Sequence, residues 1–559
     1  MIQNLTGLIL LLILPIFGKA QVYSYDWAFS YKGSILGQDL LTDQEGNSYV
    51  TAIFSDTFDG DPGASDIILD GGGVGKSFIQ KLNPEGELIW IREFNGDGLI
   101  NINSLTLDTA GNLYGVGIFN GTIDFDPGIG VNNITSTSKG FLVKFDTDGN
   151  LYWVKMMNGS GIAYPNALAL DNDQNPIILG SFSQTIDFDL GASIYNLSSS
   201  GSDDFFIQKV DSGGNLMWVK QIYGLQSEVA WYMASDDQDI YISGVYESTK
   251  DFDPGPGIHT LTPVGNQDIF LVKLTLDGDF VWAKSVGGGA REYPTDILID
   301  NMGSILLSGV FAGNNVDFDP GSASYLLSAL GTENGFALKI NHDGDFEWVK
   351  TFGSTEYNYV NNLALTSNNE VCLLGVYTST VDLDPGPGTN SVNSIDDLGC
   401  FVVTLDPGGN YLWSEHVARY GTHICTDTQD NLIVFGSFYG TTDFDPGIGV
   451  ANLTTTTSPN TPYFNSYLKK LSHGSLGVSS FSKADFSIYP NPASNTLTIK
   501  KQAGDHCKIT GFGADGKMIF ENEFSIPETS INIANLSGGT YTLEITVNDQ
   551  IVRKKFVKL

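Results

Sequence analysis

The sequence predicts an all-β protein: a seven-bladed β-propeller closed by its N-terminal strand, followed by a small immunoglobulin-like β-sandwich. Three observations lead to this prediction. A short acidic motif recurs seven times, four strand-like runs fill each repeat, and a tryptophan that the last repeat lacks is found near the N-terminus instead. Radial repetition of antiparallel sheets protects their edges without closing a barrel.

The acidic motif is best read as Asp-Phe-Asp-Pro-Gly, as at residues 124–128, with weaker copies at 59–63, 187–191 and 382–386. The first aspartates of the seven copies are Asp59, Asp124, Asp187, Asp251, Asp317, Asp382 and Asp443, which gives steps of 65, 63, 64, 66, 65 and 61 residues. A period of this length indicates a repeat architecture and must be interpreted before any other feature.

Residues 1–20 are typical of a secretory signal peptide. An apolar run over residues 8–17 precedes the small residues Gly18 and Ala20, so we expect the mature chain to begin at Gln21. The alternative is an uncleaved membrane anchor, for which the run is short, since a span needs about 20 residues. We expect no transmembrane segment in the mature chain.

One complete repeat illustrates the expected strands. Its apolar runs are 166–171, 176–182, 205–211 and 216–222, bounded by Gly, Asn or Asp. Such runs predict antiparallel strands joined by hairpins. The propeller is therefore predicted over residues 21–477, with the acidic motif between the second and third strands of each blade.

The fourth strand of six repeats carries a tryptophan: Trp90, Trp153, Trp218, Trp282, Trp348 and Trp413. The seventh repeat has none, but Trp27 precedes Trp90 by 63 residues, in register with the other steps. We therefore predict that residues 25–31 complete the last blade and close the ring. The tryptophans are expected to fill contacts between blades.

The composition changes after the repeats. Residues 478–484 are predicted to be a linker, and residues 485–559 contain short strand-like runs between Gly, Asn and Pro turns, with neither the acidic motif nor a tryptophan. A segment of this size can form a small β-sandwich.

This C-terminal segment resembles a known family. Residues 487–499, with Tyr489, Pro490, Asn491 and Pro492, resemble the opening motif of the type A C-terminal sorting domain of the type IX secretion system. The resemblance implies a Bacteroidetes-type bacterium, export across both membranes, interaction with the secretion machinery, and a final location that is secreted or attached to the outer-membrane surface. In that family the domain is usually removed. The alternative is an unrelated immunoglobulin-like module.

The repeats have a resemblance of their own. Residues 105–117 and 141–153 are similar to the β-propeller repeats of secreted bacterial proteins. Those families have no single activity, so this resemblance implies a fold and not a function.

The formal net charge of −36 lies in the repeat region, whereas residues from Asp485 onward are near neutral. Such a surface disfavours nucleic acid and anionic lipid as partners. Four cysteines in 559 residues are no disulfide framework. Cys372, Cys400 and Cys425 are expected to be buried small side chains, and a disulfide among them is left open.

The acidic motif has two interpretations. In the structural one, Phe enters the core and Asp-Pro-Gly makes the bend. In the other, the paired carboxylates bind calcium, since hard oxygen ligands suit that ion. The candidate ligands are Asp124, Asp126, Asp187, Asp189, Asp251, Asp253, Asp317, Asp319, Asp382, Asp384, Asp443 and Asp445.

The connections between blades are expected to lie on the same face as the acidic motifs, and they carry aromatic and charged residues. Such residues suit stacking on sugars or anchoring a peptide, and the alternative is packing between loops. The candidates are Tyr164, Trp231, Arg291, Glu292, Tyr293, Glu356, Tyr357, Tyr359, Arg419 and Tyr420.

No catalytic motif is present: the six histidines are scattered, without a His-Glu-x-x-His or Gly-x-Ser-x-Gly pattern. We therefore expect an exported, non-enzymatic binding or adhesion module for glycan or protein, with no cofactor other than calcium. The alternatives are a polysaccharide-active enzyme with paired acidic residues and a structural surface component.

Overall fold

The computed structural model describes residues 22–33, 35–63, 65–128, 130–223, 229–394, 398–445, 450–455, 464–474, 486–489, 492–501, 507–512, 517–524, 528–547 and 550–559. Every named element in this part of the chain is a strand. One compact unit spans Tyr23–His473, and a second contains the described residues after it. The predicted signal peptide (1–20) and linker (478–484) lie outside the described residues. Within the described ranges, no helix could cross a bilayer.

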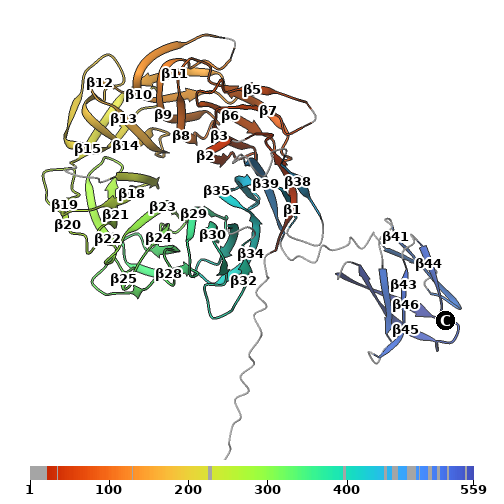
Figure 1. Cartoon of the computed structure of the whole chain (residues 1–559). Coiled ribbons are helices and arrows are strands. Elements are labelled where there is room, and N and C mark those ends of the chain that lie inside the picture. Colours follow the sequence, from red (N-terminus) through yellow and green to blue (C-terminus); the bar gives the residue numbers. More distant parts are fainter. Residues whose placement is uncertain are drawn as a thin grey trace, which may run out of the picture. The chain divides into compact units, whose positions relative to one another are not determined.

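The described residues of the first unit form seven sheets of four main strands each (Figure 1). The first strand of a sheet is the one given first for it below, and the sheet is named after that strand. The first three are β2 (Ile35–Thr42), β3 (Ser48–Phe54), β6 (Lys76–Leu82) and β7 (Leu88–Glu93); β8 (Ile100–Leu107), β9 (Leu113–Asp124), β10 (Asn133–Phe145) and β11 (Leu151–Met156); and β13 (Ala163–Leu170), β14 (Pro176–Asp187), β15 (Asn196–Val210) and β16 (Leu216–Ile222), with the short β12 (Asn158–Gly159) on β14.

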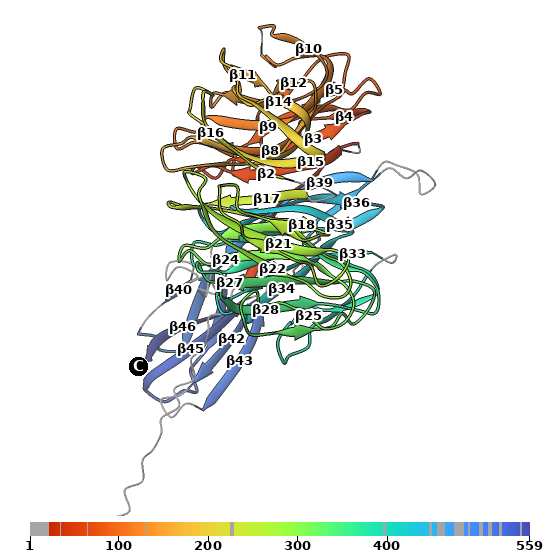
Figure 2. The same cartoon turned by 90° about the vertical axis from the view of Figure 1, so that its left-hand side faces the viewer.

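The other four sheets follow the same order. They are β17 (Val229–Ser235), β18 (Asp239–Tyr246), β21 (Asp268–Thr275) and β22 (Phe280–Val286); β23 (Glu292–Ile299), β24 (Ile305–Phe311), β27 (Asn334–Ile340) and β28 (Phe346–Phe352); β29 (Asn358–Leu365), β30 (Val371–Tyr377), β33 (Gly399–Leu405) and β34 (Tyr411–Ala418); and β35 (Tyr420–Thr426), β36 (Leu432–Phe438), β39 (Asn465–Gly474) and β1 (Val22–Ser30). Figure 2 shows β17, β18, β21 and β22 side by side in this order.

The first strands line the middle of the unit (Figure 1). β2, β8, β13, β17, β23, β29 and β35 contact one another in this order, and β35 contacts β2 in turn. Each of them has a one-residue bulge against its second strand, so the backbone bends at the same height in every sheet. The bulged residues are Gln38, Asn103, Asn166, Trp231, Thr295, Asn361 and Thr422.

The acidic motif folds as a closed turn. In the copy at residues 124–128, Asp124 Oδ1 accepts hydrogen bonds from the backbone N–H of Asp126 (3.0 Å) and of Asn132 (2.7 Å), and Phe125 is fully buried. Short strand pairs frame the same turn in five sheets, and in the β8 and β13 sheets the long strands themselves do so. The pairs are β4 (Thr57–Asp59) with β5 (Ile68–Asp70), β19 (Lys250–Asp251) with β20 (Thr260–Leu261), β25 (Val316–Asp317) with β26 (Leu326–Leu327), β31 (Thr380–Asp382) with β32 (Ser391–Asn393), and β37 (Thr441–Asp443) with β38 (Asn452–Thr454).

The two ends of the first unit meet in the β35 sheet, where β1 pairs with β39. The backbone N–H of Tyr31 donates to the carbonyl of Ser466 (2.9 Å). Trp27 Nε1 donates to the carbonyl of Pro84 (3.0 Å), which lies in the hairpin of the β2 sheet. The predicted placement of residues 25–31 beside the last repeat therefore agrees with the strand order.

The same contact joins other neighbouring sheets, because a tryptophan donates to the hairpin carbonyl of the next sheet. The equivalent bonds are Trp90 to Thr147 (3.2 Å), Trp218 to Leu276 (3.2 Å) and Trp348 to Pro407 (3.1 Å). A lysine of the third strand shares three of these acceptors: Lys209 with Leu276 (3.2 Å), Lys339 with Pro407 (3.4 Å) and Lys470 with Pro84 (3.0 Å). We call this pairing of lysine and tryptophan on one carbonyl the carbonyl clamp.

These lysines are also paired with carboxylates inside their own sheets, in six of the seven. The pairs are Lys81–Asp43 (3.5 Å), Lys144–Asp108 (3.4 Å), Lys209–Asp171 (2.6 Å), Lys273–Asp239 (3.0 Å), Lys339–Asp300 (2.7 Å) and Lys470–Asp427 (3.0 Å). Burial alone would raise the pKa of Asp427, but hydrogen bonds from Asn431 and Lys470 hold it below its ordinary value. In the β29 sheet both partners are replaced, by Thr366 and Thr404.

A carboxyl pair is buried between the β17 and β23 sheets. Glu292 and Asp268 are almost completely inaccessible to solvent. Glu292 Oε2 accepts from the N–H of Gly288 (3.0 Å), and Asp268 Oδ2 accepts from that of Val264 (2.9 Å). Burial raises the pKa of Glu292 to about 8; the Gly288 hydrogen bond opposes this shift and the charge of Asp268 adds to it.

The second unit contains two sheets that share one hydrophobic cluster, which includes Leu497, Ile509, Ile531 and Leu543. The first sheet is β40 (Phe486–Tyr489), β41 (Thr496–Lys501) and β44 (Glu528–Asn532), and the second is β43 (Met518–Phe524), β42 (Cys507–Phe512), β45 (Gly539–Val547) and β46 (Gln550–Lys558).

Removing residues 1–31 should expose the edge of β39 and cause self-association, since an unpaired strand edge pairs with other chains. Size-exclusion chromatography with light scattering measures this. A synthetic peptide of residues 22–31 should restore the monomer, whereas the same peptide with Trp27→Ala and Tyr31→Ala should not. A truncated chain that stays monomeric and as heat-stable as the full chain would contradict the role of β1.

Glu292→Gln should stabilise the protein more at pH 8 than at pH 5. The folded-state pKa of about 8 exceeds the unfolded value of about 4.3, so the folded protein keeps a proton that the unfolded chain loses, and stability falls as the pH rises through this window. Glutamine cannot ionise, and the expected gain at pH 8 is on the order of 1–3 kcal/mol. Thermal unfolding at both pH values measures it, with the exposed Glu356→Gln as control. Equal gains at the two pH values would refute the assignment.

Candidate functional site

Four of the predicted ligand-binding residues occupy one register position. Tyr164, Tyr293, Tyr359 and Tyr420 each lie two residues before the bulge of a first strand. The equivalent residues in the other sheets are Leu36, Asn101 and Val229. This position lies at the end of the first strands where the connections between sheets and the acidic motifs are found. We call this end the connection end, and the opposite one the hairpin end.

Three adjacent sheets gather these tyrosines into a cluster, which we define as Tyr293, Tyr357, Tyr359 and Tyr420. The rings of Tyr357 and Tyr359 are stacked, with centroids 6.4 Å apart and an interplanar angle of 23°. The phenol of Tyr293 lies within electrostatic reach of that of Tyr420. Tyr357 and Tyr420 are exposed, so the cluster is open to solvent.

An ion pair lies beside the tyrosine cluster. Arg291 Nε donates to Glu333 (3.1 Å), and its guanidinium lies 6.0 Å from the ring centroid of Tyr293. Burial raises the pKa of Tyr293 to about 12; Glu333 adds to the shift and Arg291 opposes it. Burial and a hydrogen bond with Glu333 raise the pKa of Tyr359 well above its ordinary value. No sequence pattern indicated Glu333, which directly precedes β27 and forms an isolated bridge with Tyr357.

The remaining candidates lie elsewhere. Glu292 is fully buried, so its side chain is not available to a ligand in this structure. Glu356 is exposed beside Tyr357. Tyr164 and Trp231 belong to the β13 and β17 sheets, and Trp231 is the bulged residue of its strand. Neither is a member of the tyrosine cluster.

A cavity of about 310 Å³ lies beside Tyr420. Its walls are mainly apolar and include Leu36, Phe435 and Phe464, with the side chain of Arg419 among them. The guanidinium of Arg419 lies 5.4 Å from the ring centroid of Phe464. Arg419 Nε is enclosed, and no described residue accepts a hydrogen bond from it.

One residue after each bulge, a second ring of side chains surrounds the middle of the unit. Its members, which we call the axial belt, are Asp39, Ser104, Ala167, Tyr232, Asp296, Asn362 and His423. Each of them is partly accessible to solvent. Because a bulge shifts the alternation of side chains by one, the sequence pattern did not reveal this ring.

Three belt residues satisfy the free backbone of the neighbouring first strand. Asp39 Oδ2 accepts from the N–H of Leu105 (2.7 Å), Asp296 Oδ2 from that of Leu363 (2.9 Å), and Asn362 Oδ1 from that of Ile424 (2.7 Å). First strands are sheet edges, and an unpaired N–H in a crowded centre costs free energy. The belt therefore has a structural role in these sheets.

The belt also contains groups with shifted pKa values. Burial raises the pKa of Asp296 to about 7, opposed by hydrogen bonds from the backbone of Leu363 and Ile297 and increased by the charge of Asp39. Burial raises the pKa of Asp39, and His423 opposes this. Burial lowers the pKa of His423, and Asp39 opposes this. Two carboxyl groups and an imidazole thus share the centre of the unit.

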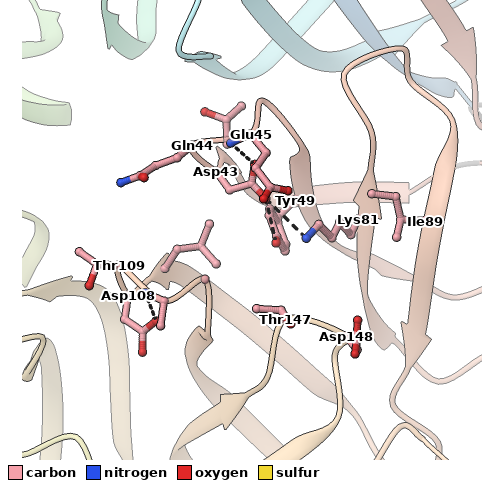
Figure 3. A pocket seen from close by; sticks show the side chains of 14 residues that line it. Asp43, Gln44, Glu45, Tyr49, Lys81, Ile89, Asp108, Thr109, Thr147 and Asp148 are labelled. Atoms are coloured by element: carbon pink, nitrogen blue, oxygen red, sulfur yellow. Dashed lines mark hydrogen bonds and ion pairs between the residues drawn. The ribbon is translucent and has the colours of Figure 1, made fainter.

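A cavity of about 540 Å³ opens at the hairpin end between the β2 and β8 sheets (Figure 3). Figure 3 shows Asp43 directed toward Tyr49 and Lys81, with Asp108 and Asp148 on the other side. Asp43 pairs with Lys81, and Asp108 with Lys144. The inner acids of this cavity therefore already have cationic partners.

The structure also bears on the predicted calcium ligands. In the copy at residues 251–255, Asp251 Oδ1 accepts from the N–H of Asp253 (3.1 Å) and of His259 (2.8 Å), and Asp253 Oδ1 accepts from that of Gly255 (2.7 Å). One oxygen of each carboxylate is thus engaged by the backbone. No group of three or more His, Cys, Asp or Glu suited to a metal occurs within the described residues.

The three cysteines of the repeat region are free thiols, and Cys372 and Cys400 are buried. In the second unit, Tyr489 of the predicted sorting motif is exposed, as is Pro492, whereas Pro490 and Asn491 lie outside the described residues.

Comparisons with known proteins give three kinds of match. An uncharacterized WD repeat-containing protein of Acanthamoeba polyphaga mimivirus is 21% identical over 491 residues, covering 72% of this chain and 35% of that protein. Regulatory protein FlaEY of Caulobacter vibrioides is 24% identical over 353 residues, covering 61% of this chain and 34% of that protein. The chain thus spans about a third of the length of these relatives.

Two solved structures resemble the chain at a TM-score of 0.16 each. One is the extracellular domain of a one-component system of B. thetaiotaomicron, at 11% identity with 97% of this chain and 99% of that chain covered. The other is PorZ, a surface component of the type IX secretion system of Porphyromonas gingivalis, at 12% identity with 96% and 100% covered.

The C-terminal region gives a direct family match. Residues 487–559 match the secretion system C-terminal sorting domain. These residues contain the segment whose motif predicted such a domain from the sequence. The chain therefore carries a C-terminal sorting domain of the type IX secretion system, and it is a secreted or outer-membrane surface-attached protein.

Proposed function

We propose that the first unit is a seven-bladed β-propeller closed by its N-terminal strand, that the sorting domain is an immunoglobulin-like sandwich, and that the exported propeller binds glycan at its connection end. The tyrosine cluster is the binding surface. The strand order supports the ring, since β1 completes the sheet of β35, β36 and β39.

The observation that carries the binding role is the register of the tyrosines. Tyr293, Tyr359 and Tyr420 occupy one position on three adjacent first strands, where other sheets have Leu36 or Asn101. The fold therefore does not need an aromatic ring there. Exposed, adjacent aromatic faces with nearby charged groups suit stacking on sugar rings.

A second candidate function is hydrolysis of a polysaccharide. The axial belt favours it, because Asp39 and Asp296 interact electrostatically and burial raises the pKa of both. A carboxylic acid that is protonated near neutral pH can act as a general acid, and a second carboxylate can assist it. The backbone hydrogen bonds of both residues weigh toward a structural role.

Tyr357→Ala, Tyr359→Ala and Tyr420→Ala should each weaken glycan binding by roughly three- to tenfold, because each removes one stacking face. A glycan array followed by calorimetry on the purified full chain measures this. Tyr195→Ala, an exposed tyrosine outside the cluster, is the matched control. Unchanged binding in all three variants, with unchanged melting temperatures, would remove the cluster from the proposal.

Asp296→Asn should leave glycan binding intact, because asparagine keeps an oxygen that can accept from the Leu363 N–H. The same variant should abolish any release of reducing ends from a bound polysaccharide if the second candidate holds. A reducing-end assay beside the binding assay separates the two functions. Hydrolysis by the unmodified protein that Asp296→Asn eliminates would replace the binding role with an enzymatic one.

We also propose that the acidic motif folds without calcium, since backbone N–H groups already engage its carboxylates. The melting temperature should then be the same in excess calcium and in excess chelator, because an ion that binds only the folded state stabilises it. Differential scanning calorimetry of the full chain checks this. A higher melting temperature with calcium, reversed by the chelator, would establish the motif as a calcium site.

A further inference from the structure

We infer that the glycan bound at the connection end is acidic, and that the cavity beside Tyr420 receives the carboxylate of a uronic acid residue through Arg419. This inference rests on the proposed function and specifies its ligand class. It starts from Arg419, whose guanidinium has no carboxylate partner among the described residues.

Arg419 stands in the connection between β34 and β35 and is partly buried. Its Nε is enclosed without a hydrogen-bond partner, and none of its other nitrogens is paired with a described carboxylate. Removing a guanidinium from water without a counter-charge costs free energy. In a chain of net charge −36, carboxylates are abundant. An arginine that no described carboxylate pairs is available to a ligand.

The neighbouring Arg291 provides the contrast. It also lies at the connection end and touches the tyrosine cluster, but its guanidinium is bound by Glu333 (Nε to Oε1, 3.1 Å). Its charge is thereby neutralised, and it holds Glu333 and Tyr293 in place. Of these two arginines, Arg419 alone can supply net positive charge to an incoming group.

The cavity around Arg419 suits a sugar ring that bears a carboxylate. Leu36, Phe435 and Phe464 give it apolar walls, and Thr422 and Ser437 add hydroxyl groups. Its volume of about 310 Å³ is at the lower end for small-molecule sites, which are about 300–1,000 Å³. A guanidinium binds a carboxylate through two parallel hydrogen bonds. Tyr420 lines the cavity and belongs to the cluster, so one chain of sugars can contact both.

One observation favours an acidic sugar over an acidic peptide. A peptide that adds a strand needs a free sheet edge, whereas the first strands have several of their backbone groups bound by the axial belt and the bulged residues. Asn361 Nδ2, for example, donates to the carbonyl of Gly421 (2.9 Å). The overall negative charge does not exclude an acidic ligand of either kind, because it acts weakly beyond about 8 Å at physiological salt, and the short-range contact with Arg419 then decides binding.

The test is calorimetry of the purified full chain with three matched pairs of oligosaccharides. The acidic members are oligomers of galacturonate, alginate and hyaluronan, and each partner is the same oligomer with its carboxylates methyl-esterified. A peptide with a free C-terminal carboxylate is the third kind of probe. At least one acidic oligomer should bind about tenfold or more tightly than its ester.

The variants identify the residue responsible. Arg419→Gln should abolish the preference for the acid, Arg419→Lys should keep part of it, and Arg92→Gln, a control outside both the tyrosine cluster and the cavity, should leave the preference intact. A preference that survives Arg419→Gln would overturn the inference, as would equal binding of acid and ester.

The outcomes separate this inference from the proposed function. If acid and ester bind equally and Tyr359→Ala weakens both, the glycan-binding role stands and the acidic ligand falls. If no oligosaccharide binds, or only the peptide does, both fall. Circular dichroism and the melting temperature of each variant verify that it is folded.

Discussion

The carbonyl clamp is the interaction that joins neighbouring sheets at three junctions of the ring. In it, a lysine Nζ and a tryptophan Nε1 of one sheet donate to a single hairpin carbonyl of the next. Leu276, Pro407 and Pro84 supply such carbonyls. The third clamp joins the two ends of the unit: its tryptophan is on β1, its lysine on β39, and its acceptor in the β2 sheet. The first and last parts of the unit are therefore joined by the same kind of hydrogen bonds as two pairs of consecutive sheets, without a covalent link between them.

The architecture was largely predictable because its determinants are local. Strand runs, hairpin turns and the acidic motif are each encoded within a few residues, and the register of Trp27 with Trp90 indicated that β1 completes the sheet of the last repeat. The axial belt was not predictable in the same way. It depends on bulges at residues such as Gln38 and Thr295, which a two-residue alternation cannot reveal.

The candidate site was predicted in part. Tyrosines in or next to connections between strands stood out in the sequence, and three first strands bring several of them together. The sequence could not show that Glu333 holds Arg291 while Arg419 has no described partner, because charge pairing depends on side chains from separate segments. For the same reason the sequence could not show that Glu292 is buried near Asp268, although glutamate is usually exposed. The register position of Tyr359 is occupied by Leu36 and Asn101 in other sheets. The fold therefore does not determine the residue type there, and a binding site can be built at such a position without changing the fold.

The replacement of the buried ion pair in the β29 sheet by Thr366 and Thr404 has a consequence for how such chains can grow. The buried lysine–aspartate pairs lie within single sheets, and the clamps between sheets use main-chain oxygen atoms, which every sequence supplies. The junction of the β29 and β35 sheets differs, because the buried Lys469 of β39 pairs with Glu415 of β34. Exchanging either of these two repeats alone would leave a charged group stranded in its neighbour, whereas the repeat of the β13 sheet keeps its buried pair, Lys209 and Asp171, within itself.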